Sequence, residues 1–363
     1  MASTFGNTLK VQVFGASHGK AIGVVVDGLP TGELIDLAAL QVFLDRRRPG
    51  GSKLATQRNE ADAPVFLSGI EDGVLTGSPL AAYIANTNAR SADYKGFADT
   101  PRPSHADFTA QMRYGKSVDL RGGGHFSGRL TAPMCIAGGI ALQILEKRGV
   151  LVGAHLKQVG NVFDDPLPLH PDKALFAQIL SHPLPTIGAN ASETMAQAIL
   201  EARDALDSVG GVVECAATGL PAGLGSPIFD GVENRLAAAL FGIPAVRGVA
   251  FGDGFAAASM KGSEHNDPFC MKDGAVATET NHAGGVLGGI TTGMPLVVSV
   301  AVKPTASIAR EQQTVELATG RAARIAVTGR HDPCIALRAV PVVEAVTAFT
   351  LLDLLMEQDH GSY

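Results

Sequence analysis

Two histidines lie in short turns, where a side chain has little apolar surface to fill. His18 lies in the segment GASHG at 15–19, and His105 lies in RPSHAD at 102–107. An imidazole with an ordinary pKa of about 6.5 can hold or release a proton near neutral pH. One such turn alone is equally well explained as a surface hairpin. The two turns together favour acid/base chemistry.

Arginines adjoin several other turns. Next to glycine, proline or histidine stand Arg102, Arg121, Arg129 and Arg330. A guanidinium group can bind carboxylate or phosphate through two parallel hydrogen bonds. The arginine run at 46–48 ends a predicted helix, where the helix dipole also favours cations. The arginines in turns indicate a ligand with several anionic groups.

Three glycine-rich segments have the composition of phosphate-binding loops. The triple glycine at 122–124 precedes a segment with helical spacing, so its N–H groups either hold an anion or only form a tight loop with positive φ. The segment 15–20 resembles a phosphate-binding loop, but it is one residue short and Ala21 replaces the Ser or Thr that binds magnesium. We reject that interpretation. The run GGVLGG at 284–289 indicates a bend.

Two further polar segments follow predicted strands or precede a helix. In RHDPC at 330–334, Asp332 and Pro333 suit the cap and first position of a helix, and the same carboxylate is also placed to face a ligand. The segment KPTAS at 303–307 suits either a polar ligand loop or a capped turn. The His, Cys and Asp residues share no metal-ligand spacing, and Ser17 lacks a nucleophile elbow. From the residues alone we predict an acid/base enzyme that acts on a small polyanion.

Apolar periodicity predicts the elements that position these residues. Strands are expected at 9–14, 22–26, 64–70, 79–86, 211–217, 246–251 and 296–302, and helices at 36–44, 128–147, 192–208, 231–241 and 332–356. Pro341 is expected to kink or restart the last helix. The segment 87–104 is expected to be a long loop. Because no Pro/Ser-rich linker divides the chain, we expect one integrated α/β unit.

The composition limits the class of protein. Of 363 residues, 46% are hydrophobic and 18% are charged, which favours a large folded core over disorder. A net charge of −6 argues against nucleic acid as a partner. Four cysteines without a Cys-x-x-Cys pair indicate reduced, mostly buried thiols. We expect a soluble cytoplasmic protein, because no signal peptide is recognisable and no apolar run approaches a membrane span.

Taken together, these motifs resemble those of the chorismate synthase family, in the same order and over essentially the whole chain. The matching segments are GASHG at 15–19, GVVVDGLP at 23–30, RRRPG at 46–50, TQR at 56–58, RPSHAD at 102–107, RGGG at 121–124, GLPAGLG at 219–225, GDGF at 252–255, NHAGG at 281–285, KPT at 303–305 and GRHDPC at 329–334.

The resemblance implies a lyase of the shikimate pathway, which serves aromatic amino acid biosynthesis. Members of the family convert 5-enolpyruvylshikimate 3-phosphate to chorismate by a 1,4-anti elimination of phosphate, and they require reduced FMN although no net redox change occurs. NADPH is implied only indirectly, for flavin reduction, and we expect a separate flavin reductase. His18 is implied to donate a proton to the departing phosphate. His105 is implied to support the protonation state of the flavin, and Asp332 to assist the flavin N5 position in removing the substrate proton.

The resemblance also implies a set of binding residues and a fold. The implied substrate-binding residues are Ser17, Arg47, Arg48, Arg102, Ser127, Arg129 and Arg330. The implied flavin-binding residues are Arg47, Lys53, His125, Phe126, Ser127, Ala245, Gly288, Lys303, Pro304, Thr305, Ala306, Ser307 and Arg330. The implied fold is a β-α-β sandwich of the α/β (α+β) class, with helices between two four-stranded antiparallel sheets. It would form one catalytic domain over 1–363 with two pseudo-repeated halves, assembled as a homotetramer.

Four sites depart from the family pattern. Ala16 stands where an acidic residue is usual, and Lys53 replaces an arginine. His125 and Phe126 replace Arg-Ser, which removes one expected contact with the flavin phosphate, and Pro244 replaces an asparagine. Two other functions stay open. One is a flavin-dependent or shikimate-pathway transferase that uses the same anion pocket, and the other is a binding protein that kept the fold without turnover.

Overall fold

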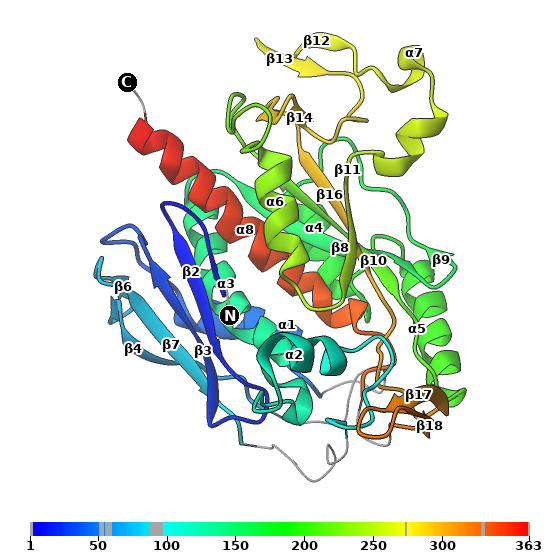
Figure 1. Cartoon of the computed structure of the whole chain (residues 1–363). Helices are drawn as coiled ribbons and strands as arrows, with labels where there is room; N and C mark the ends of the chain where they lie inside the picture. The colour runs from blue at the N-terminus through cyan, green and yellow to red at the C-terminus, as the bar shows by residue number, and fades with distance from the viewer. Residues whose placement is uncertain are drawn as a thin grey trace.

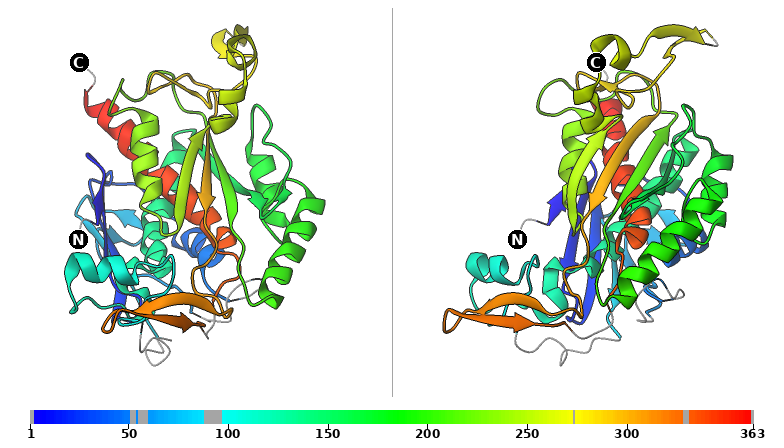
Figure 2. Two further views of the ribbon diagram at one scale, coloured as in Figure 1. Left: turned by 45° about the vertical axis from the view of Figure 1, so that its right-hand side comes forward. Right: turned by 90° about the vertical axis from the view of Figure 1, so that its right-hand side faces the viewer.

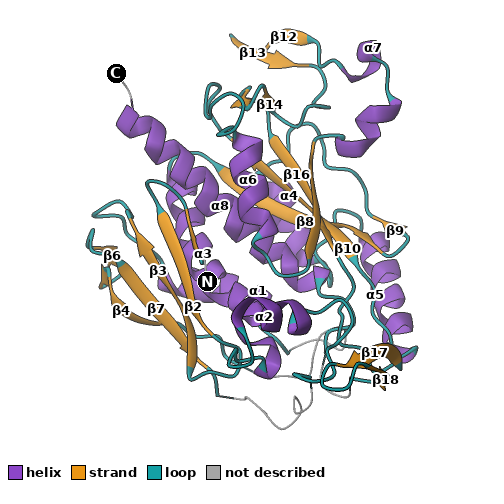
Figure 3. Ribbon diagram, in the orientation of Figure 1, coloured by secondary structure: helices purple, strands orange, loops and turns teal. Residues whose placement is uncertain are grey.

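Two antiparallel sheets enclose a pair of long helices (Figures 1 and 3). The structure is a computed structural model that describes residues 3–50, 54, 60–87, 97–272, 274–327 and 331–361. The turned views of Figure 2 show the C-terminal helix lying between the sheets. This arrangement confirms the predicted α/β sandwich.

The N-terminal sheet is built from strands that alternate between core and solvent. Val11 and Val13 are buried whereas Lys10 is exposed, as the period of two in a strand requires. The sheet has five strands, not the four that were expected, because the short β1 pairs with β2 at one edge. Their order is β1 (Thr4–Phe5), β2 (Lys10–Gly15), β3 (Ala21–Asp27), β7 (Leu80–Ala85) and β4 (Val65–Ser68).

The second sheet is also five-stranded, since the short β9 extends it past β8. Its inner face carries Val213, Cys215 and Val300, all fully buried. The strand order is β11 (Val246–Phe251), β16 (Leu296–Val302), β10 (Gly211–Thr218), β8 (Leu151–Val159) and β9 (Val162–Phe163).

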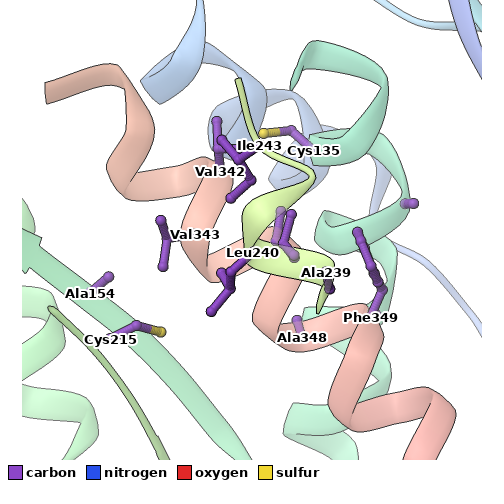
Figure 4. Packing of buried hydrophobic residues seen from close by; sticks show 14 of the residues in the cluster. Cys135, Ala154, Cys215, Ala239, Leu240, Ile243, Val342, Val343, Ala348 and Phe349 are labelled. Atoms are coloured by element: carbon purple, nitrogen blue, oxygen red, sulfur yellow. The ribbon is translucent and has the colours of Figure 1, made fainter. Parts of the chain in front are cut away.

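Helices α3 (Thr131–Lys147) and α8 (Ala336–Gly361) form the core between the sheets. They approach closely at Gly138, where a Cβ would lie 2.5 Å from the carbonyl oxygen of Ala345, so only glycine fits there. Figure 4 shows Val342 and Phe349 of α8 packed among apolar side chains of neighbouring elements. One continuous hydrophobic cluster joins both sheets to these helices.

The remaining elements surround this core. The other helices are α1 (Leu37–Arg47), α2 (Asp107–Tyr114), α4 (Lys173–Ser181), α5 (Ala189–Asp204), α6 (Val232–Phe241) and α7 (Gly262–His265). Short helical turns are η2 (Arg121–Phe126), η3 (Gly128–Leu130) and η4 (Gly254–Ser259). Small hairpins are β5–β6 (Ile70–Glu71, Val74–Leu75), β12–β13 (Phe269–Lys272, Ala275–Thr278), β14–β15 (Val286–Leu287, Ile290–Thr291) and β17–β18 (Gln312–Glu316, Arg321–Ile325).

The predicted strands and most predicted helices are confirmed, with local corrections. Asp36 caps α1 as expected, with its Oδ1 accepting from the N–H of Ala39 at 2.9 Å. The predicted cap at Asp332 is wrong, because α8 begins only at Ala336. Pro341 does not restart the helix, because α8 continues through it and its buried neighbours Val340 and Val342 hold the helix in the core. Much of the predicted loop at 87–104 lies outside the described residues.

Two helical segments reach the length and hydropathy of a membrane span, so the expectation that no apolar run approaches one was wrong. They are Gly128–Lys147 and Ala336–Asp359. Within the protein, 78% and 94% of their apolar windows are buried. A helix that is packed on all sides is apolar all round for the same reason as a membrane helix. Both segments therefore serve as core helices here.

Candidate active site

A cavity of about 820 Å³ opens where the N-terminal sheet, α8 and several loops meet. One part of its wall is apolar and comes from β2, α6 and α8, including Val13, Phe241 and Val346. The other part is polar and carries arginine, histidine, serine and lysine side chains. This division suits a ligand that combines an apolar ring with charged groups.

Arg102, His105 and Asp107 form a buried hydrogen-bonded cluster on the polar wall. Arg102 donates to Asp107 through Nε at 2.7 Å and Nη2 at 2.8 Å, and His105 Nδ1 lies 2.7 Å from Asp107 Oδ1. Burial raises the pKa of Asp107, but the hydrogen bonds from Arg102 and His105 outweigh it and hold that pKa well below its usual range. Asp107 is therefore ionised and can accept a proton from His105 Nδ1, which also lies 3.0 Å from Arg102 Nη2.

The remaining nitrogen of His105 lies beside the triple glycine. A Cβ on Gly123 would lie 3.4 Å from His105 Nε2. His105 lines the cavity and its side chain is 19% exposed. A neutral imidazole held at Nδ1 by a carboxylate presents Nε2 as a proton acceptor, and it becomes a donor once protonated. The cavity wall therefore carries an imidazole at this point.

His18 and Ser17 are buried directly behind the same loop. A Cβ on Gly122 would lie 2.5 Å from His18 Nε2 and 2.9 Å from Ser17 Oγ, so glycine is required where the two turns meet. The N–H of Ser17 donates to the carbonyl of Gly124 at 3.0 Å. Ser17 Oγ is buried and has no hydrogen-bond partner among the described residues. A buried hydroxyl in that state is free to hydrogen-bond a ligand.

The triple glycine forms the tight loop that was one of its two sequence interpretations. All three residues have positive φ, at 60°, 87° and 56°, so the tight loop is real. The loop leads through η3 into α3, whose N-terminus faces the cavity through Ser127, Arg129 and Thr131. Backbone N–H groups at a helix start favour an anion.

A second charged cluster joins α1 to the start of α3. Asp62 accepts a hydrogen bond from Arg47 Nη1 at 2.6 Å and another from Arg129 Nη1. Glu60 lies 2.8 Å from the same Arg129 nitrogen. Burial lowers the pKa of Arg47 to about 10, and the nearby Arg338 adds to that effect. Arg47 is still protonated at neutral pH.

The loop after β16 closes the polar wall. Ser307 Oγ accepts from Arg102 Nη1 at 3.0 Å, and Thr305 Oγ1 donates to the carbonyl of Asp332 at 2.7 Å. The carboxylate of Asp332 accepts from Arg338 Nη1 at 2.6 Å, instead of capping a helix. Segments that are hundreds of residues apart in the sequence therefore meet at one cavity.

Comparisons with known proteins agree with this geometry. The model of a family described as chorismate synthase matches residues 9–356. The chain belongs to the chorismate synthase family. Proteins named chorismate synthase from Methanocella arvoryzae and Lancefieldella parvula are 47% and 45% identical to it. Each alignment covers 98% of this chain, and they cover 94% and 96% of the two relatives.

A solved structure entitled "Crystal Structure of Chorismate Synthase" has the same fold. It superposes with a TM-score of 0.75 at 26% identity, covering 99% of this chain and 94% of the other. Membership of the chorismate synthase family supports an enzymatic function in the shikimate pathway.

Most residues that the chorismate synthase resemblance implied lie at the cavity. Its lining includes Arg47, Arg102, His105, His125, Phe126, Ser127, Arg129, Ala245, Lys303, Pro304, Thr305, Ala306, Ser307 and Asp332. Lys53 and Arg330 lie outside the described residues. Their structure therefore adds nothing to the predictions made for them.

The implied residues Arg48 and Gly288 do not line the cavity, and neither does Arg121, one of the arginines predicted in turns. Arg48 lies on the surface at the end of α1, with its guanidinium 3.3 Å from Asp45, because its neighbour Arg47 occupies the inward-facing position. Gly288 lies in the β14–β15 turn and does not line the cavity of this chain. Arg121 points outward and pairs with Asp119 at 2.8 Å.

His125 lines the cavity, but both of its ring nitrogens are engaged by protein groups. Nδ1 lies 2.8 Å from the carbonyl of Gly15, and Nε2 lies 2.8 Å from Ser3 Oγ. Because a carbonyl only accepts, Nδ1 carries the proton and Nε2 accepts from the serine hydroxyl. His125 therefore ties the N-terminal strand to the triple-glycine loop.

Five polar residues of the site were not singled out from the sequence. Asn86 donates to the carbonyls of Ala16 and Gly19, both at 3.0 Å, and its Oδ1 accepts from Arg129 Nε at 3.3 Å. It thereby joins the His18 turn to Arg129. The others are Glu60, Asp62, Asp107 and Arg338. Asp107 was visible in the RPSHAD motif, and its spacing of two from His105 was the available signal.

Proposed function

We propose that this protein is a chorismate synthase that eliminates phosphate from 5-enolpyruvylshikimate 3-phosphate to give chorismate. The observation that carries the proposal is the meeting of Arg47, Arg102, Arg129 and Asp332 with His105 at one cavity. In the sequence these residues come from four distant segments, since only Arg102 and His105 are neighbours. A shared cavity gives them a common ligand.

The charges suit this substrate. It carries two carboxylates and a phosphate, and the polar wall presents several guanidinium groups in a low-dielectric setting. Asp107 and Asp62 offset part of this charge, which keeps the arginines buried in the absence of ligand. Loss of phosphate develops negative charge on the leaving oxygen. Nearby cations and a proton donor lower that barrier.

The residues also fit reduced FMN, which would supply the electronic assistance that the elimination needs. Arg129 Nη2 is buried at the cavity and has no hydrogen-bond partner among the described residues, so it is available to an anionic group. We propose that Phe126, Ala245 and the loop 303–307 hold the flavin, with Arg47 and Ser127 near it. The apolar wall excludes water from the ring.

Proton handling is assigned to three side chains. His18 is buried beside Gly122 and is proposed to give the proton that the departing phosphate takes up. His105, held by ionised Asp107, is proposed to maintain the protonation state of the flavin. Asp332, kept in place by Arg338, is proposed to assist removal of the substrate proton. One proton and one phosphate leave the substrate, so no net redox change occurs.

We also propose a cytoplasmic homotetramer. The four cysteines are free and three of them are buried, which suits a reducing compartment. Phe269, Met271 and Val276 share one face of the β12–β13 hairpin and are 68%, 70% and 63% exposed. A short two-stranded hairpin is marginal by itself, so a second copy that covers this face is expected to stabilise it. Light scattering of the wild type and of Met271→Asp tests this, and a monomeric wild type contradicts it.

The decisive experiment is an anaerobic assay with reduced FMN and 5-enolpyruvylshikimate 3-phosphate. Phosphate release together with chorismate absorbance is the expected result. If neither phosphate nor chorismate forms while tight flavin binding is retained, the result favours a binding protein and refutes the synthase. Transfer of the enolpyruvyl group without chorismate would favour a transferase. Repeating the assay with oxidised FMN and NADPH, with and without an added reductase, tests our proposal that reduction depends on a separate reductase.

A further inference from the structure

Asp62 lies between two guanidinium groups that come from distant segments. Its Oδ2 accepts from Arg47 Nη1 at 2.6 Å, and its Oδ1 accepts from Arg129 Nη1. The three side chains are 1%, 3% and 5% exposed for Asp62, Arg47 and Arg129. In such a buried setting, hydrogen bonds between charged groups are strong and fix the orientation of both side chains.

Arg47 and Arg129 differ in how many of their guanidinium nitrogens are hydrogen-bonded to described protein groups. Arg47 donates through Nε to Thr131 Oγ1 at 3.1 Å and through Nη2 to the carbonyl of Gly128 at 3.4 Å, so each of its nitrogens has a protein partner. Arg129 Nη2 has none among the described residues, although it is buried and Arg129 lines the cavity. Because a guanidinium is planar, holding Nη1 on Asp62 also sets the direction of Nη2.

We propose that Asp62 is a positioning residue that aims Arg129 Nη2 at an anionic group of the bound ligand. The inference rests on the proposed function, in which that group is a phosphate or carboxylate of the substrate or the phosphate of FMN. Asp62 touches neither ligand itself. It acts through Arg129.

The backbone and the charges of the cluster support this role. Asp62 has φ of 48°, a left-handed conformation that a non-glycine residue adopts only at some expense, so the surrounding contacts must hold it there. Arg129 and Arg338 each repel the guanidinium of Arg47. Removing the carboxylate between Arg47 and Arg129 would let their guanidinium groups separate.

Asp62→Asn tests the proposal because two explanations predict opposite signs. If Asp62 aims Arg129, the variant should lose on the order of 10²-fold in kcat/KM, as small misplacements at reacting centres do. Inorganic phosphate should then also inhibit it less strongly than it inhibits the wild type. If Asp62 merely offsets positive charge, phosphate should inhibit the variant more strongly, and that outcome overturns the proposal.

Separate titrations identify which anion Arg129 holds. Quenching of flavin fluorescence measures the affinity for oxidised FMN, and the KM for substrate measures the other ligand. Weaker FMN binding with unchanged KM assigns Nη2 to the flavin phosphate. A raised KM with unchanged FMN binding assigns it to the substrate. If neither changes in Asp62→Asn, the proposal is wrong.

A double-variant cycle shows whether Asp62 acts through Arg129. Asp62→Asn combined with Arg129→Gln should lose no more activity than Arg129→Gln alone, since contacting groups are not additive. Additive losses contradict the proposal. This neutral pair also serves as the folded comparison if Asp62→Asn alone melts at a low temperature. Asp45→Asn, which removes the carboxylate that pairs with Arg48 on the surface at the end of α1, is the control for net charge and should match the wild type.

The outcomes separate this inference from the proposed function. A wild-type protein that binds no FMN and releases no phosphate refutes the function itself. An active wild type with an equally active Asp62→Asn refutes only the positioning role.

Discussion

The imidazole of His18 packs directly against the backbone of Gly122. A β-carbon at Gly122 would lie 2.5 Å from His18 Nε2, and the glycine has a positive φ of 60°. The short distance concerns the position of His18, whereas the positive φ concerns backbone strain alone. A pair of glycine substitutions separates them.

Gly122→Ala should lower turnover nearly as much as His18→Ala. The new methyl group must displace the ring that is proposed to protonate the leaving phosphate. A left-handed alanine alone adds a strain of about 1–2 kcal/mol. Gly149→Ala is the matched control, because Gly149 has φ of 80° with nothing within 4 Å of its added Cβ. Equal kcat values for the two alanine variants would show that the His18 contact is irrelevant.

Asp107→Asn should reduce kcat, by up to about 10²-fold, while the protein stays folded. The amide cannot hold the Nδ1 proton of His105 as an anion does, so the wrong tautomer becomes accessible and Nε2 loses its acceptor role. The pH profile of kcat distinguishes this effect from a structural one. A purely structural variant would lower kcat at every pH and leave the shape of the profile unchanged. Asp204→Asn, on an exposed surface pair, is the control. A wild-type profile in Asp107→Asn contradicts the assignment.

Substitution of the neighbouring residues Arg47 and Arg48 should affect stability to very different degrees. Arg47→Met leaves Asp62 without one of its two cations and is expected to lower the free energy of unfolding by roughly 3–5 kcal/mol, with loss of activity. Arg48 is 43% exposed in its side chain and pairs with Asp45 on the surface, so Arg48→Met should change stability by less than about 0.5 kcal/mol. Chemical denaturation and kcat/KM measure both effects. Strong loss of substrate affinity in Arg48→Met would restore its implied binding role.

These arginines show what the sequence can predict. Apolar alternation predicted the strands correctly, because every second side chain of a strand faces the core, as Val11 and Val13 do. The motifs located the histidines and arginines because their residue types are unusual for turns. Arg47 and Arg48 could not be distinguished by type. Only the end of α1 determines which one faces inward.

The carboxylates of the site were hidden for a different reason. Asp62 lies in a segment without periodicity, and its partners Arg47 and Arg129 are brought to it by tertiary packing. Asp332 had the local pattern of a helix cap, but its carboxylate binds Arg338 from the following helix. Ion pairs between distant segments leave no spacing in the sequence. A structure is needed to find them.

A buried charge network away from the cavity should make stability depend on pH in two directions. His155 lies between Asp164, 2.7 Å from Nδ1, and Glu214, 3.2 Å from Nε2. Burial opposes the charged form of His155, but the two carboxylates outweigh it and raise the pKa of His155. Burial also opposes the charged form of Glu214, but hydrogen bonds from His155 and Lys157 outweigh it and lower the pKa of Glu214 to about 2.

Glu214 therefore stabilises the fold above its ordinary pKa of 4.5, and this contribution is lost as the pH falls toward 2. His155 stabilises it below its ordinary pKa of 6.5, and that contribution is lost as the pH rises through the raised value. Consequently, the wild type should exceed His155→Gln in unfolding free energy by the most between about pH 4.5 and 6.5, by roughly 3 kcal/mol. Urea denaturation from pH 3 to 9 measures the difference. His170→Gln, at an exposed site, should give a small difference without that maximum, and a flat curve for His155→Gln would mean that the imidazole is not charged in the folded protein.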